Sequence, residues 1–215
     1  MLITYHGHSE FLLETEGGLR ILLDPFNPDI PFAYREVEAD IVTCSHDHAD
    51  HNHIQKVKGH PIVINELGFH SPADEVGITG YPSFHDDVQG AKRGKNTIYL
   101  IQIEGLRIVH LGDLGALPDE KTLQMLKSAD VLLIPVGGTY TIAAPEAAAL
   151  AKRLNARITI PMHYKKGTQG LQNISSAEGF IQAMLPLIPS QQPLLRITHQ
   201  DIGEAPRLVL LDVSH

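Results

Sequence analysis

Three histidines and two aspartates fall close together in the stretch Ser45-His46-Asp47-His48-Ala49-Asp50-His51. The residues just before it, 39–44, are predicted to form a short buried strand, which would place the tract at a strand end that substrate can reach. In an extended segment alternate side chains share a face, so His46, His48 and Asp50 are expected to point the same way. Asp50 and His51 are adjacent and must diverge, so a single metal ion is not expected to take all four side chains.

This spacing predicts two neighbouring divalent ions, one on His46 and His48 and the other on Asp50 and His51. Imidazole and carboxylate groups without thiolate suit zinc, with manganese or iron as alternatives. The competing interpretation is a solvated loop or a tag-like tract. Tags are terminal, whereas this tract is internal and needs five polar residues at fixed offsets, so the pattern favours metal binding.

The elements that would position these groups are mostly short strands. Residues 2–5, 10–14 and 19–23 predict an antiparallel meander, with Gly17-Gly18 as a turn. Residues 66–80 are expected to hold a short helix and then a strand. Helices are expected from Pro118, from Pro145 and after a Ser175-x-x-Glu178 capping box. Further strands are expected at 61–64, 97–103, 106–111, 131–136, 157–160, 194–199 and 206–212.

Eight short motifs make the chain resemble the metallo-β-lactamase superfamily, and within it the compact metal-dependent hydrolases similar to ascorbate-phosphate lactonase. The histidine tract and the motif Pro161-Met162-His163-Tyr164 are the most specific. All eight follow the order found in the family, through residue 164. They are residues 4–9, 22–25, 45–51, 84–87, 93–96, 110–113, 135–138 and 161–164.

The resemblance implies an α/β (α+β) fold, a four-layer αβ/βα sandwich with the metals at one edge between two sheets, as a single domain over residues 1–215. It implies His85 as the third ligand of the first ion and His163 as a ligand of the second. Asp113 is expected to bridge both ions, and flanking glycines at a strand end also suit that role. His110 is expected to face away from the metals.

Two further residues are expected to support the centre rather than bind metal. His8 is assigned a structural or supporting role, and Asp24 is expected to orient a metal-bound imidazole. The alternative for Asp24 is a turn residue at a strand end before proline. Roles for His6 and His110 are not assigned by spacing.

Such a site predicts hydrolysis by a metal-bound hydroxide that attacks an ester, lactone or phosphoester. Asp50 is expected both to bind metal and to take a proton. Basic residues follow two proposed ligands, which suggests a small anionic substrate, although solvated loop charges are the plainer explanation. The candidate substrate-binding residues are Arg93, Lys95, Tyr140 and Lys165.

Rival functions are a small-molecule phosphodiesterase, a di-iron redox protein and a non-catalytic metal-binding scaffold. Redox relatives usually carry a carboxylate where His85 stands, together with a fused flavin domain. A degenerate scaffold would be expected to have lost ligands, and all seven are present in this sequence. Hydrolysis is therefore the preferred function.

The charge and cysteine content of the sequence indicate which classes of binding partner and which cellular location to expect. The net charge of −8, from 25 acidic and 17 basic residues, argues against nucleic acid and against an anionic membrane surface. A small-molecule substrate is expected, and a homo-oligomer is compatible with the sequence. A single cysteine, Cys44, and the lack of a visible secretory signal predict a cytoplasmic location.

Overall fold

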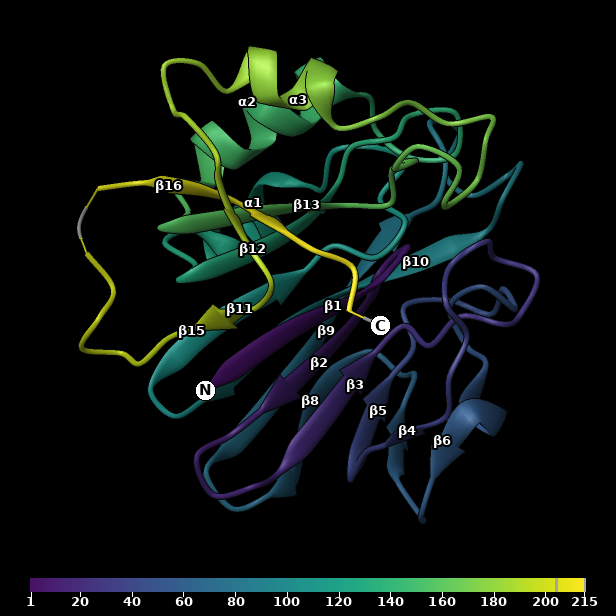
Figure 1. Ribbon diagram of the computed structural model, residues 1–215, viewed down its shortest axis with the longest axis vertical. Helices are drawn as coiled ribbons and strands as arrows, with labels where there is room; N and C mark the ends of the chain where they lie inside the picture. Colours follow the sequence, from purple (N-terminus) through teal and green to yellow (C-terminus); the bar gives the residue numbers. More distant parts are fainter. Residues whose placement is uncertain (204, 215) are drawn as a thin grey trace.

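The computed structural model describes residues 1–203 and 205–214, which form two large facing β-sheets (Figure 1). The six-stranded sheet comprises, in spatial order, β15 (Leu195–Arg196), β1 (Leu2–Gly7), β2 (Glu10–Glu14), β3 (Arg20–Leu23), β5 (Ile41–Thr43) and β7 (Ile62–Ile64). The eight-stranded sheet comprises β14 (Ser190–Gln192), β16 (Arg207–Leu211), β13 (Ile158–Met162), β12 (Val131–Pro135), β11 (Leu106–His110), β10 (Lys95–Ile103), β9 (Val76–Phe84) and β8 (Gly68–Ala73).

The main hydrophobic core lies between the two sheets. Strand β1 contributes Ile3 and Tyr5 to it, and strand β12 contributes Val131 and Leu133. The alternate residue Leu132 belongs to a second core on the outer face of the eight-stranded sheet. Strand β12 is therefore buried on both faces, which explains why it reads as a continuous apolar run.

Three helices cover that outer face: α1 (Glu120–Leu126), α2 (Ala144–Leu154) and α3 (Glu178–Ala183) (Figure 1). Helix α1 begins after Asp119, whose side chain accepts a hydrogen bond from the Thr122 amide at 2.7 Å. Such an N-cap satisfies a backbone donor that the helix itself cannot. None of the helices in the described residues is long and apolar enough to cross a membrane.

The outer face of the six-stranded sheet is covered differently. A two-stranded ribbon, β4 (Val37–Glu38) with β6 (Val57–Lys58), and the 3₁₀ turn η1 (Ile54–Lys56) pack there around the buried Cys44. The expected α/β sandwich is confirmed. The fourth layer contains no α-helix in the described residues, and the turn η1 and the β4–β6 ribbon occupy it instead.

Two local predictions were wrong. Residues 66–80 form no helix, because strands β8 and β9 pair there as an antiparallel hairpin in which Val76 and Ile78 alternate with less buried residues. Ser175 does not cap helix α3, whose N-cap is Ala177. The Ser175 amide donates to the Gly137 carbonyl at 2.7 Å, and its carbonyl accepts from the Lys165 amide, so Ser175 is held in the loop before the helix.

Strand direction brings the predicted ligands to one rim. In the six-stranded sheet, β1, β3 and β5 run the same way, since β2 is antiparallel to both of its neighbours and β3 is parallel to β5. In the eight-stranded sheet, β9 and β11 run together with β12 and β13. The carboxyl ends of six of these strands, β1, β3, β5, β9, β11 and β13, lead into the histidines and carboxylates described next.

Candidate metal centre

Each predicted ligand follows the carboxyl end of a strand. The histidine tract follows β5, His85 follows β9, Asp113 follows β11 and His163 follows β13. Close backbone approach makes this convergence feasible. A Cβ atom at Gly115 would lie 2.3 Å from the His85 carbonyl carbon, so glycine is required there for the loops after β9 and β11 to meet.

The histidine tract converges by a turn rather than by extended alternation, so that part of the prediction was wrong. The amides of His51 and Asn52 both donate to the His48 carbonyl, at 2.9 and 3.0 Å. The turn folds His46 and His51 toward each other, with ring centroids 4.4 Å apart. In an extended strand these two side chains, five positions apart in the sequence, could not come this close.

Two groups of possible ligand atoms lie side by side. His46, His48 and His85 offer three nitrogen atoms within 4.8 Å of one another, which is the set expected for the first ion. Asp50 and His51 form a second group, in which His46 also takes part. A third group contains His163 and His51 together with His8, which was not expected to reach so far into the centre.

Asp113 lies at the junction of these groups and is almost completely buried. Its Oδ2 atom is 3.2 Å from His51 Nε2, 3.4 Å from His85 Nε2 and 3.3 Å from His163 Nε2. Burial would raise the pKa of Asp113, but the charges of His163 and His51 outweigh it and lower the pKa well below its ordinary value. One carboxylate oxygen therefore faces histidines from both expected ion sites.

These residues fit divalent cations. Two buried polar atoms at this centre, His51 Nε2 and Asp113 Oδ1, have no hydrogen-bond partner within the described chain. Buried polar atoms are rarely left unpaired unless a water or an ion is to meet them. Burial also lowers the pKa of His46 to about 3, which keeps this imidazole in the neutral form that binds metals.

Positive charge is favoured at the same place. Burial alone would lower the pKa of His51, but Asp113 and then Asp24 outweigh it and raise the pKa well above its ordinary value. The surroundings of His51 therefore stabilise a cation, which in a metal site is the ion rather than a proton.

Asp24 and His8 lie where supporting residues were expected. Asp24 is fully buried and accepts hydrogen bonds from His51 Nδ1 at 2.8 Å and from the Ser45 amide at 2.8 Å. His8 Nε2 lies 3.2 Å from Asp50 Oδ2, and burial lowers the His8 pKa to about 4. His110 faces away, and its Nε2–H donates to the Ser9 carbonyl at 2.9 Å.

A cleft of about 320 Å³ opens over the centre, which we call the metal cleft. Of the four candidate substrate-binding residues, Arg93 and Tyr140 line it, and the Arg93 guanidinium lies 5.4 Å from the centre of the Tyr140 ring. Lys95 lines a neighbouring groove instead. The metal cleft is lined by His48, Asp50, His85, Arg93, Asp113, Tyr140, His163 and Leu171.

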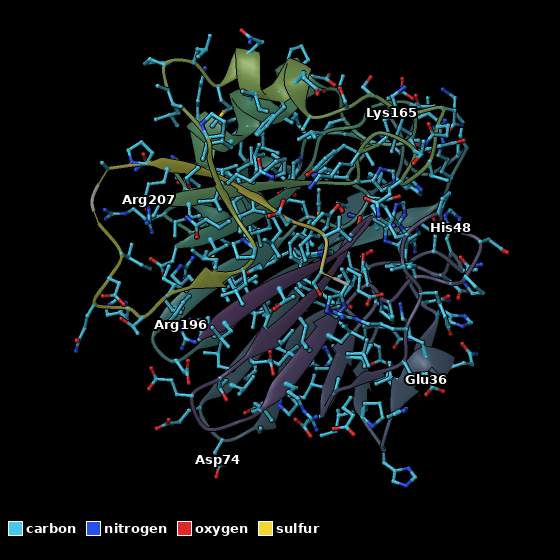
Figure 2. The ribbon with its side chains drawn as sticks, in the orientation of Figure 1. Glu36, His48, Asp74, Lys165, Arg196 and Arg207 are labelled. Atoms are coloured by element: carbon cyan, nitrogen blue, oxygen red, sulfur yellow. The ribbon has the colours of Figure 1, made fainter. Side chains whose placement is uncertain are left out.

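Lys165 does not line the metal cleft. It lies in a separate hollow with Lys166 and Glu178, near helix α3, and in Figure 2 it stands apart from His48. Lys165 lies two residues after His163, whose positive φ of 51° redirects the chain at the end of the strand, and the Lys165 amide donates to the Ser175 carbonyl at 3.1 Å. The structure therefore gives no support for substrate binding by Lys165.

Two residues that lie in the family motifs, but to which the sequence analysis assigned no role, hold the ligands in place. Asn96 donates to the Leu111 carbonyl at 3.0 Å and accepts from the Asp113 amide at 2.9 Å. Asp86 is buried and accepts from the amides of Val88, Gly90, Lys92 and Arg93 at 2.7–2.9 Å. Burial would raise the Asp86 pKa, but these four donors outweigh it and lower the pKa to about 2.

Replacing Asp86 with alanine is expected to loosen the loop that presents Arg93. Four amides lose their acceptor, so their hydrogen exchange should accelerate on the order of tenfold or more. Exchange followed by mass spectrometry over residues 86–94 measures this. Asp87→Ala is the matched control, because Asp87 is exposed and its carboxylate contacts only Lys92. Equal exchange in both variants would refute the anchoring role.

This arrangement of two facing sheets, with a histidine and aspartate centre on the rim between them, defines a class of hydrolase domain. The sequence model of the beta-lactamase superfamily domain matches residues 2–163. The chain therefore belongs to the metallo-β-lactamase superfamily, and within it to a family of metal-dependent hydrolases shown by the following relatives.

A UPF0173 metal-dependent hydrolase of Methanosphaera stadtmanae is 33% identical, with 76% of this chain and 84% of the relative covered. One from Archaeoglobus fulgidus is 31% identical, with coverage of 76% and 83%. Among solved structures, a Thermotoga maritima protein of the metallo-β-lactamase superfamily is 35% identical with a TM-score of 0.79. That match covers 98% of this chain and 97% of the Thermotoga chain.

Proposed function

We propose that the protein hydrolyses an ester, lactone or phosphoester bond in a small anionic substrate, with two divalent metal ions held at the rim. The observation that carries the proposal is the position of Asp113 Oδ2, within 3.2–3.4 Å of histidines from both ligand groups. The Thermotoga relative, described as a candidate zinc-dependent hydrolase, supports the same chemistry.

The proposed ligand sets are those that the family resemblance implies, and the grouping of His46, His48 and His85 supports the first of them. His46, His48 and His85 would hold one ion, and Asp50, His51 and His163 the other, with Asp113 shared between them. Zinc suits these nitrogen and oxygen donors best, with manganese or iron as alternatives. When bound, such ions lower the pKa of water and polarise a carbonyl or phosphoryl oxygen.

The chain's own residues supply proton transfer and orientation. Asp50 is the proposed proton acceptor, since its carboxylate is 27% exposed toward the cleft while its Oδ2 is fixed by His8. Water adds its oxygen to the acyl or phosphoryl centre, the bond to the leaving oxygen breaks, and the proton taken by Asp50 passes to that oxygen. Arg93 and Tyr140 face the same cleft and would bind the anionic part of the substrate.

A hydrolysis screen of zinc-loaded protein tests the proposal. The panel should contain lactones, carboxylic esters, phosphomonoesters and phosphodiesters, the last of which probe the phosphodiesterase alternative. His48→Ala is expected to lower turnover on the order of 100-fold or more, because it removes a proposed ligand. The exposed His60 gives the control His60→Ala. Turnover that survives loss of His48 would contradict the proposal.

A further inference from the structure

A second hollow adjoins the metal cleft, and we call it the side groove. Its volume is about 630 Å³, and it shares His48 and Arg93 with the metal cleft. Binding sites for small molecules typically span roughly 300–1,000 Å³. The metal cleft, at about 320 Å³, lies at the lower end of that range, so a substrate larger than the cleft would extend past His48 and Arg93 into the side groove.

Part of the lining of the side groove is apolar and exposed. Leu67 is 52% exposed, Phe84 is 37% exposed, and Pro82 is also exposed. Isolated exposed apolar residues are ordinary, but several lining one hollow indicate a binding surface. The side groove is lined by Ser45, His46, Asp47, His48, Asn65, Leu67, Pro82, Ser83, Phe84, Arg93, Gly94, Lys95, Asn96 and Thr97.

The charges at the junction of the two hollows are positive. Arg93 lines both, Lys95 lines the side groove, and neither forms an ion pair among the residues that the structure describes. The acidic residue in the groove, Asp47, accepts a hydrogen bond from Asn52. Asp86 binds the Arg93 backbone amide rather than its guanidinium, which leaves the guanidinium free for a ligand. A carboxylate or phosphate group is its natural partner.

From these features we infer that the substrate is an anionic amphiphile. Its scissile group lies in the metal cleft, its anionic group contacts Arg93 at the junction, and an alkyl or aryl arm fills the side groove against Leu67, Pro82 and Phe84. The inference rests on the proposed function for the scissile group. The apolar arm follows from the lining of the side groove alone.

Binding of non-hydrolysable probes tests the inference without turnover. Calorimetry on zinc-loaded and zinc-free protein should compare 1-hexanesulfonate, methanesulfonate and 1-hexanol. We expect 1-hexanesulfonate to bind at least tenfold more tightly than methanesulfonate, because only the former has an apolar arm. Arg93→Gln should weaken 1-hexanesulfonate roughly tenfold and leave 1-hexanol unchanged.

A matched pair of truncations locates the arm. Leu67→Ala should weaken 1-hexanesulfonate roughly fivefold to tenfold. Met125→Ala should have no effect, because Met125 is similarly exposed, at 49%, but lies on helix α1 outside both hollows. Equal effects of the two truncations, or equal affinity for the two sulfonates, would overturn the inference.

Hydrolysis kinetics on four esters distinguish a failure of this inference from a failure of the proposed function. The 4-methyl ester of 2-hexylsuccinate carries its carboxylate and hexyl arm on the same carbon, beyond the scissile ester, and monomethyl succinate lacks the arm. Methyl 3-methylnonanoate and methyl butanoate are their uncharged counterparts. We expect kcat/KM for the hexylsuccinate ester to exceed that of the other three at least tenfold. Equal hydrolysis of all four esters would refute the amphiphilic substrate and leave the proposed hydrolase function standing. If the sulfonate probes bind as expected but no ester is hydrolysed, the amphiphilic ligand stands and the result counts against ester hydrolysis.

Discussion

Asp113→Asn is expected to reduce the bound metal from the proposed two ions per chain to at most one, and to lower kcat/KM at least roughly 1,000-fold, equivalent to about 4 kcal/mol of transition-state stabilisation. Asparagine keeps the shape of the side chain but removes the negative charge that faces His51, His85 and His163 at 3.2–3.4 Å. Without that charge, two cations held close together would repel each other with little compensation.

Metal analysis by mass spectrometry, combined with kinetics on a substrate found in the hydrolysis screen, measures both effects. The fold should survive, because the Asp113 amide keeps its hydrogen bond to Asn96 Oδ1. Asp74→Asn is the matched control, since Asp74 is exposed at the end of the molecule remote from His48 (Figure 2). Two ions per chain and unchanged kinetics in Asp113→Asn would exclude Asp113 as the shared ligand.

The sequence was most informative where residues able to bind metal stand at the end of a predicted strand. The tract around His48, the isolated His85 and the strand-end Asp113 were all predicted to meet, and the structure places them together. The tract can be found from its own spacing, whereas His85 and Asp113 were assigned as ligands through the family motifs that contain them. The shape of the tract was not predictable in the same way, since whether a polar segment turns or extends depends on what packs around it.

Supporting residues were the hardest to find. Asn96 joins Leu111 and Asp113 across 15 and 17 positions of sequence, and the motif 93–96 that contains it does not indicate those partners. Asp86 lies in the motif 84–87, but its four amide donors depend on a loop conformation that sequence spacing does not specify. Long-range hydrogen bonds leave no periodic signal, so structure is needed to find them.

Another example is a buried polar network beside the metal centre. Glu10 is fully buried, and its Oε2 accepts from Lys56 Nζ at 2.7 Å and from the Phe26 amide at 3.0 Å. Its Oε1 lies 2.7 Å from His6 Nδ1, which gives His6 a structural role. The Lys56 ammonium also lies 3.8 Å from the centre of the Phe26 ring. The network joins strands β1 and β2 to the turn that follows the histidine tract.

Glu10→Ala is expected to lower the free energy of unfolding by about 3–5 kcal/mol, because it leaves the Lys56 ammonium buried without its counter-charge. Burial already lowers the pKa of Lys56 against the opposing effect of Glu10, so losing Glu10 removes the group that keeps the ammonium charged. Chemical denaturation of metal-free protein measures the change without a contribution from bound ions.

Two further variants make the measurement specific. Glu14→Ala, on the same strand, should change the unfolding free energy by less than about 0.5 kcal/mol, because Glu14 is only half-buried and outside the network. The double variant Glu10→Leu/Lys56→Met should recover most of the loss, since replacing both charges of a buried pair with apolar groups is often neutral or stabilising. If Glu10→Ala costs less than about 1 kcal/mol, water must reach Lys56, and the network cannot be what fixes the turn beside the metal centre.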